Sequence, residues 1–154
     1  MRIMIAAAVA LMLAAPPAAA ENPTPYSGMK SVETKTPFAA YVKKLKGAIK
    51  ANRMGIVGHA CANCSAKAIG VTIPGNNVVM IFHPKFAVRM LKASVAAGIE
   101  APLRLYVTEN KDGTARLTYR LPSHVFGAYQ VPDLDAMGRE LDAIVAKIVA
   151  DAAG

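Results

Sequence analysis

The chain lacks the sequence patterns of several common enzyme classes. It has no Ser-His-Asp spacing of a hydrolase triad, no paired carboxylates for acid–base catalysis and no glycine-rich phosphate loop. It has no internal repeat, only three histidines and only two cysteines. Without any of these catalytic patterns, the sequence does not decide whether the protein is an enzyme.

Only one long apolar run is present, and it lies at the start of the chain. Arg2 precedes an apolar stretch from Ile3 to Ala14, which two prolines and the triplet Ala18-Ala19-Ala20 follow. This order is typical of a secretory signal peptide over residues 1–20, with cleavage after Ala20. The run is too short for a confident membrane span, which needs about 20 residues; an uncleaved anchor is the alternative. The sequence therefore predicts an exported, periplasmic or secreted protein with no stable membrane span.

The remaining 134 residues are enough for one domain with one core. Residues 21–28 (ENPTPYSG) are polar and proline-rich, so we expect a flexible tail before a single domain at 29–154. Removal of Arg2 changes the net charge from +8 to +7. An exported protein rarely meets nucleic acid, and we therefore interpret the positive charge as a solvated surface and expect no nucleic-acid partner.

Apolar patterns predict five strands, at residues 29–35, 54–58, 77–82, 103–108 and 116–121. After Asn77, the run at 77–82 (NVVMIF) is continuously apolar, which suits a central strand covered on both faces. It ends at His83-Pro84, because proline cannot donate to a strand ladder. Asp112-Gly113 favours a hairpin turn between the last two strands.

Apolar residues at helical spacing predict three main helices. The first opens at Thr36-Pro37, the second carries Phe86, Met90 and Val95, and the third opens at Pro132. A short helix is expected at 65–69. Lys43, Lys46 and Lys50 fall on the outer side of the first helix, so we expect a solvated face there.

The resulting order is β-α-β-β-α-β-β-α. Strands and helices in this order indicate an α+β fold, in which helices pack on one mostly antiparallel sheet.

Several segments resemble a bacterial family known as domain of unknown function 302 (DUF302). They are the strand end Ile81-Phe82-His83-Pro84, the helical Met90-Leu91, the segment Gly98–Leu103, and the hairpin from Asp112-Gly113 to Tyr119, with Pro122 after it. The resemblance covers roughly Met29 to Ala152. It implies a curved sheet gripping a long helix, often in a homodimer, but no common activity.

Two features depart from that family pattern and carry possible ligands. The family usually has Phe-Gly-Asn-Pro where this chain has Phe82-His83-Pro84. The segment H-A-C-A-N-C, with His59, Cys61 and Cys64, is an addition to the general pattern. If the strand before residue 59 pairs with the strand ending at 82, the two features could meet.

Three functions of Cys61 and Cys64 stay open. A disulfide forms readily in an oxidising compartment, but a bridge that closes a loop of only about four residues adds little to the stability of the fold. A thiol–disulfide redox protein could use Cys61 as the attacking thiol, although the Trp-Cys and cis-proline pattern of thioredoxin-like proteins is missing. Finally, the cysteines could hold a metal ion or haem.

For the metal hypothesis, the ligands would be His59, Cys61, Cys64 and His83, a Cys2His2 set suited to zinc or copper. Covalent haem is disfavoured, because Ser65 and not histidine follows Cys64; non-covalent haem stays open. Such a domain would serve a periplasmic redox or metal-handling partner. A non-catalytic ligand-binding or interaction module is a further alternative.

Tyr119 and His124 are candidate pocket residues. Alternation along its strand points Tyr119 inward, where a buried hydroxyl needs a partner. A loop is expected from Pro122 to Val131, after the hairpin; it contains His124, which would contribute a ligand if this loop folded back over the end of the sheet.

Overall fold

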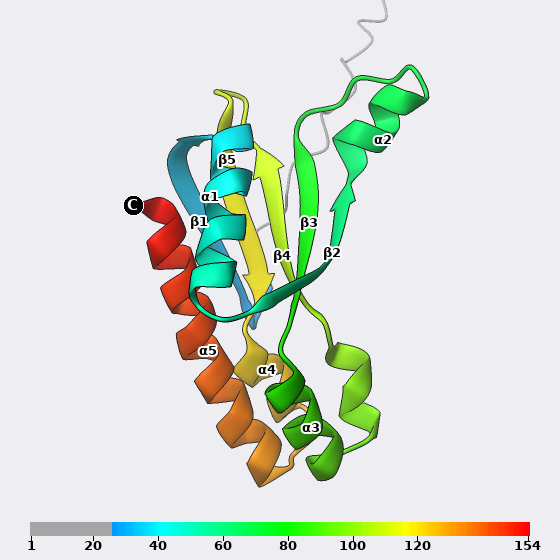
Figure 1. Cartoon of the computed structure of the whole chain (residues 1–154), viewed down its shortest axis with the longest axis vertical. Coiled ribbons are helices and arrows are strands. Elements are labelled where there is room, and N and C mark those ends of the chain that lie inside the picture. Colours follow the sequence, from blue (N-terminus) through cyan, green and yellow to red (C-terminus); the bar gives the residue numbers. More distant parts are fainter. Residues whose placement is uncertain (1–25) are drawn as a thin grey trace, which may run out of the picture.

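The computed structural model describes residues 26–154, which form five strands and, between and after them, five α-helices and one short 3-10 helix (Figure 1). The strands are β1 (Met29–Pro37), β2 (Gly55–Cys61), β3 (Asn76–Phe82), β4 (Leu103–Glu109) and β5 (Thr114–Arg120). The helices are α1 (Phe38–Ala51), α2 (Ala62–Ala68), α3 (Pro84–Ala93), η1 (Ala96–Glu100), α4 (Pro122–Gly127) and α5 (Pro132–Ala153). The predicted order is confirmed, with η1 and α4 as additions.

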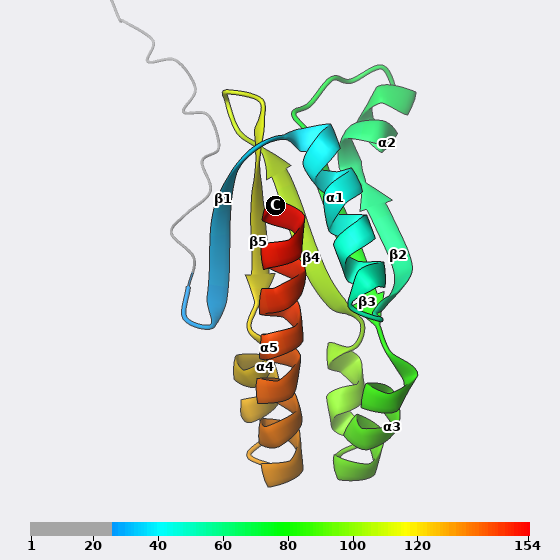
Figure 2. The same cartoon turned by 60° about the vertical axis from the view of Figure 1, so that its left-hand side comes forward.

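One open antiparallel sheet has the strand order β1-β5-β4-β3-β2, so the predicted α+β class is confirmed. Helices α1 and α5 lie side by side across one face of it (Figure 2). The core between them contains Leu45 and Ile49 of α1, Val79 of β3, Leu117 of β5 and Ile148 of α5. Gly113, at φ +80°, forms the predicted hairpin turn between β4 and β5.

Strand β3 lies inside the sheet, between β4 and the edge strand β2, and the helices of residues 26–154 cover only one of its faces. Asn77, Val79 and Ile81 are buried, whereas the intervening residues are half-buried. The expectation of cover on both faces was wrong, because every sheet pairing is antiparallel and helices α1 and α5 pack on the same side.

Helices α3, η1, α4 and the first half of α5 extend below the sheet (Figure 1). They enclose a second apolar cluster, which includes Met90, Phe126, Met137 and Leu141. A Cβ at Gly138 of α5 would stand 2.8 Å from the Cα of Ser123, so glycine allows α4 to approach α5 closely. The segment 122–131, expected to be a loop, therefore contains a packed helix.

The predicted signal peptide and its cleavage point after Ala20 lie outside the described residues, as does most of the predicted tail. Tyr26–Gly28 form a turn, in which the Met29 N–H bonds the Tyr26 carbonyl at 3.0 Å. Within residues 26–154, none of the helices combines the length and the apolarity that crossing a membrane requires.

Candidate functional site

A disulfide joins Cys61, the last residue of β2, to Cys64 in the first turn of α2. Their Cα atoms lie 5.2 Å apart. Cys61 caps α2, because its Sγ accepts the Cys64 N–H at 3.2 Å. Cys61 is half-buried and Cys64 is exposed, so the bridge is accessible to solvent from the Cys64 side.

Asn77 lies beside Cys61 because β2 and β3 pair antiparallel, with Cys61 opposite Asn77. Within residues 26–154 it is the one buried polar side chain outside the aromatic residues, at 4% exposed. Its Nδ2 donates to Oδ1 of Asn63 at 3.1 Å and lies 3.8 Å from Cys61 Sγ. A buried amide needs such partners, since an unpaired polar group costs about 1–3 kcal/mol.

His59 and Lys46 extend this contact network to α1. His59 opposes Val79, so it shares the helix-facing side of the sheet with Asn77. Its Nε2–H donates to Oδ1 of Asn77. Since Nε2 carries the proton, Nδ1 is the acceptor for Lys46 Nζ, which lies 3.2 Å away. Lys46 is half-buried and contacts the site, so the expectation of a purely solvated lysine face was wrong at this position.

The network places two donors on one sulfur. Cys61 Sγ accepts the Cys64 N–H at 3.2 Å and has the Asn77 amide nitrogen at 3.8 Å, with the acceptor oxygen Oδ1 of Asn63 also near it, at 3.3 Å. Lys46 adds a positive charge behind His59. Donors and a nearby cation stabilise a thiolate relative to a thiol. Among the described residues, none donates a hydrogen bond to Cys64 Sγ, so the two sulfurs of the bridge are chemically different.

His83 is not part of this site. Gly55 opposes Phe82 and Cys61 opposes Asn77, so His83 lies at the other end of β3. Six residue steps from Asn77 correspond to roughly 20 Å. Residues 26–154 contain no group of three or more His, Cys, Asp or Glu side chains arranged to hold a metal ion. The set of His59, Cys61, Cys64 and His83 is therefore not brought together.

Tyr119 and His124 also lie apart from the disulfide. Tyr119 faces inward as predicted and is 5% exposed; burial and the charge of Asp142 raise its pKa. His124 is exposed on α4, and its ring lies over Gly28, where a Cβ would stand 2.1 Å from the ring. Neither side chain is among those around the Cys61–Cys64 bridge.

Sequence reasoning missed Asn77 and Asn63. One signal for Asn77 was available: an asparagine inside the apolar strand NVVMIF is costly to bury unless it has a specific partner. Asn63, within the C-x-x-C segment, accepts from Asn77 Nδ2 and from the Asn76 N–H, and so ties α2 to β3.

A family model described as "Domain of unknown function DUF302" matches residues 30–152. A similar solved structure is that of an uncharacterized conserved DUF302 protein from Bacillus stearothermophilus. The two chains are 16% identical; the match covers 82% of this chain and 99% of the other, with a TM-score of 0.73. That likeness shows a shared fold. No curated protein matches the chain.

Proposed function

Because the chain belongs to the DUF302 family, whose name states no activity, we propose a function from the site itself: thiol–disulfide exchange at Cys61–Cys64. The observation that carries this proposal is the pair of donors on Cys61 Sγ, the Cys64 N–H and the buried Asn77 amide. The predicted signal peptide supports an exported protein, in a compartment where such exchange occurs.

A purely structural bridge has less support. Helix α2 has no buried residue, so the bridge closes an exposed turn and contributes little to the core. A loop this short also adds little stability in the loop-closure account, about 2 kcal/mol. A metal ion or haem has no support from the positions of the four predicted ligands, since His83 lies at the far end of β3.

Exposure assigns different roles to the two sulfurs. A substrate thiolate attacks the exposed Cys64 Sγ and forms a mixed disulfide, while the Cys61–Cys64 bond breaks and its electron pair moves to Cys61 Sγ. The Cys64 N–H and the Asn77 amide stabilise that thiolate. A second substrate thiolate then attacks the substrate sulfur of the mixed disulfide. The substrate leaves oxidised, and both cysteines take up protons to become thiols.

These roles reverse the assignment expected from the sequence, in which Cys61 was the attacking thiol. Donors at Cys61 make it the better leaving group, since leaving groups of lower pKa depart faster in thiol–disulfide exchange. By the reverse path, the reduced protein attacks a substrate disulfide through Cys64, and Cys61 resolves the intermediate.

A redox titration against glutathione, followed by mass spectrometry, tests the proposal. We expect a reduction potential above about −300 mV, the region below which structural disulfides usually fall. The Cys61→Ser variant should retain a mixed disulfide at Cys64 after incubation with glutathione disulfide: the Cys64 thiolate attacks, one glutathione thiolate leaves, and no resolving sulfur remains in the protein. The matched Cys64→Ser variant should trap far less.

A potential below that value, together with no trapped species in either variant, would overturn the exchange function. The same samples distinguish the metal alternative. One equivalent of zinc or copper retained by the reduced protein, and lost in the Cys61→Ser variant, would support metal holding instead.

A further inference from the structure

Two adjoining hollows lie at the opposite end of the molecule from the disulfide. An apolar cavity opens between α3, α4 and α5, and a wider recess lies outside it against α3 and the end of α1. Met54, His83 and Phe86 line both. Since the two hollows share these walls, we treat them as one site with an inner and an outer part.

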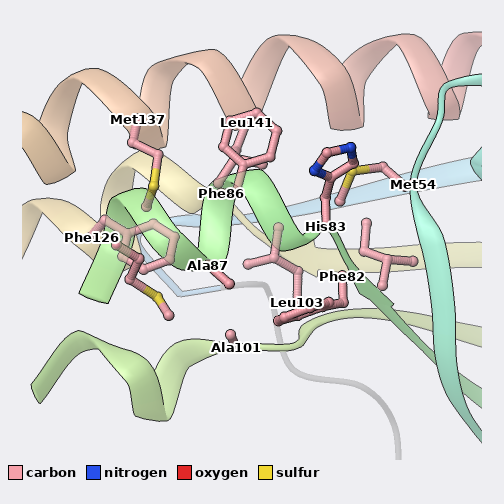
Figure 3. Close-up of a pocket in the computed structure, with 12 residues that line it drawn as sticks. Met54, Phe82, His83, Phe86, Ala87, Ala101, Leu103, Phe126, Met137 and Leu141 are labelled. Atoms are coloured by element: carbon pink, nitrogen blue, oxygen red, sulfur yellow. The ribbon is translucent and has the colours of Figure 1, made fainter. Parts of the chain in front are cut away.

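The inner part is apolar and small. Its volume is about 30 Å³, and its walls include Met90, Met137, Leu141 and Phe126. Figure 3 shows Met137 and Phe126 at one end of this cavity and His83, beside Met54, at the other. A space of this size takes the end of an alkyl chain, and methionine side chains adapt readily to such an occupant.

The outer part is larger and positively charged. Its volume is about 320 Å³, at the lower end of the range for small-molecule sites. Arg53, Lys85 and Arg89 line it against one carboxylate, Glu140, which pairs with Arg89 at 2.6 Å. In the described part of the chain, the side chains of Arg53 and Lys85 have no ion-pair partner. The recess therefore has a surplus of positive charge.

His83 stands at the boundary between the two parts. Its Nδ1 accepts the Lys85 N–H at 3.2 Å, so the ring proton lies on Nε2. No described residue accepts a hydrogen bond from that Nε2–H. The ring packs edge-on against Phe86, with centroids 5.7 Å apart. A donor is thus available next to the apolar cavity and the cationic recess.

The backbone at Arg53 is a second, independent observation. Arg53 has φ +60°, a left-handed conformation that glycine or asparagine adopts at lower cost. It directly follows Asn52, the C-cap of α1, and the next N–H, that of Met54, bonds to the Ile49 carbonyl. Because this backbone conformation costs arginine free energy, its presence here favours a role for the guanidinium charge in the recess.

We propose that this site binds a small amphiphilic anion, a carboxylate with a short apolar chain. Arg53, Lys85 and the Nε2–H of His83 receive the carboxylate, and the end of the chain enters the cavity between Phe86 and Met137. The surplus positive charge selects an anion, while the apolar inner wall selects against a purely inorganic one. This site is independent of the thiol chemistry proposed for Cys61 and Cys64.

Titration of the purified protein with straight-chain carboxylates from propionate to octanoate, followed by amide NMR shifts, tests the proposal. Each added methylene should tighten binding about threefold to fourfold until the cavity is filled. The amides of His83, Phe86 and Arg89 should shift. The alcohol of the same length as the best carboxylate should bind at least roughly threefold more weakly, because it lacks the charge.

Variants separate the site from general attraction to a basic protein. Arg53→Asn, which suits the left-handed backbone, combined with Lys85→Gln should weaken octanoate binding about threefold to tenfold. Lys92→Gln removes an exposed charge from the same helix α3 outside both hollows and should leave binding unchanged. Equal losses in both variants, equal affinity for alcohol and carboxylate, or no dependence on chain length would each overturn the proposal.

Discussion

The imidazole of His59 and the carboxamide of Asn77 form a hydrogen bond across strands β2 and β3, from Nε2–H to Oδ1. This bond determines which way the amide of Asn77 points. Because Oδ1 is engaged by His59, Nδ2 faces Asn63 and the sulfur of Cys61. The redox proposal depends on this orientation, and it leads to the first two predictions.

Asn77→Ala should slow reduction of the Cys61–Cys64 bridge by dithiothreitol. The departing Cys61 thiolate loses one donor, which corresponds to about threefold to tenfold in rate. Quenching with an alkylating reagent and counting modified cysteines measures that rate. Asn76→Ala is the matched control, because Asn76 donates to the hydroxyl of Tyr106 at 2.6 Å and not to the sulfur. Equal rates in the two variants would contradict the role of Asn77.

Lys46→Gln should slow the same reaction, by about threefold or less, since its charge acts through His59. The effect should shrink at high salt, because a partly exposed charge is screened. Lys50→Gln, at an exposed position on the same helix, should leave the rate unchanged. A loss that is equal in both variants would indicate general surface charge instead of the contact with His59.

Replacing both cysteines, Cys61→Ala with Cys64→Ala, should lower the free energy of unfolding by about 2 kcal/mol or less. The bridge closes a short loop at α2, which contributes no buried residue. In comparison, Leu45→Ala in the fully buried core should cost about 2–5 kcal/mol. Urea unfolding of the two variants measures the difference. A cysteine variant as unstable as Leu45→Ala would show that the bridge is structural after all.

Tyr41 should make the protein sensitive to strongly alkaline pH. It is fully buried, its hydroxyl has no hydrogen-bond partner among the described residues, and burial, then Tyr119, raise its pKa to about 12. In the unfolded chain the hydroxyl of Tyr41 ionises near pH 10. Above that pH the unfolded state has therefore lost a proton that the folded state retains. The free energy of unfolding should therefore fall between about pH 10 and pH 12, by roughly 2–3 kcal/mol.

Tyr41→Phe removes this ionisation and an unsatisfied buried hydroxyl. The variant should be as stable as the wild type at pH 7, or more stable, and its loss of stability between pH 10 and pH 12 should be smaller. Urea unfolding at pH 7 and at two alkaline pH values makes the comparison. Parallel pH profiles for the two proteins would contradict the assignment to Tyr41.

Local patterns predicted most of the elements. The alternation at 103–108 and 116–121 and the turn residues Asp112-Gly113 correspond to β4, β5 and their hairpin. Proline marked the start of α5 correctly, and His83-Pro84 the end of β3. These features depend on backbone preferences and apolar spacing within a few residues. They can therefore be predicted from the sequence without knowledge of the tertiary structure. Helix α4 was missed, because its six residues are too few for a periodic signal.

The expected proximity of His59 and His83 could not be predicted correctly from short segments of sequence. The strands that carry them do pair, as the hypothesis required. Antiparallel direction, however, sets His59 opposite Val79 and carries His83 to the far end of the strand. The same register brings Asn77, a residue without any sequence motif, against Cys61. Pairing direction and register belong to the whole sheet, and no short segment encodes them.

The sequence by itself determined the sequence of strands and helices, the α+β class and the closeness of Cys61 to Cys64, because each depends on residues near one another in the chain. Only the tertiary structure decided the surroundings of the chemically interesting side chains. It gave Cys61 the amide of Asn77 and, through His59, the charge of Lys46; it gave His83 an apolar cavity and Arg53. The physical reason is that these contacts form between separate strands and helices, whose packing follows from burial of the common core.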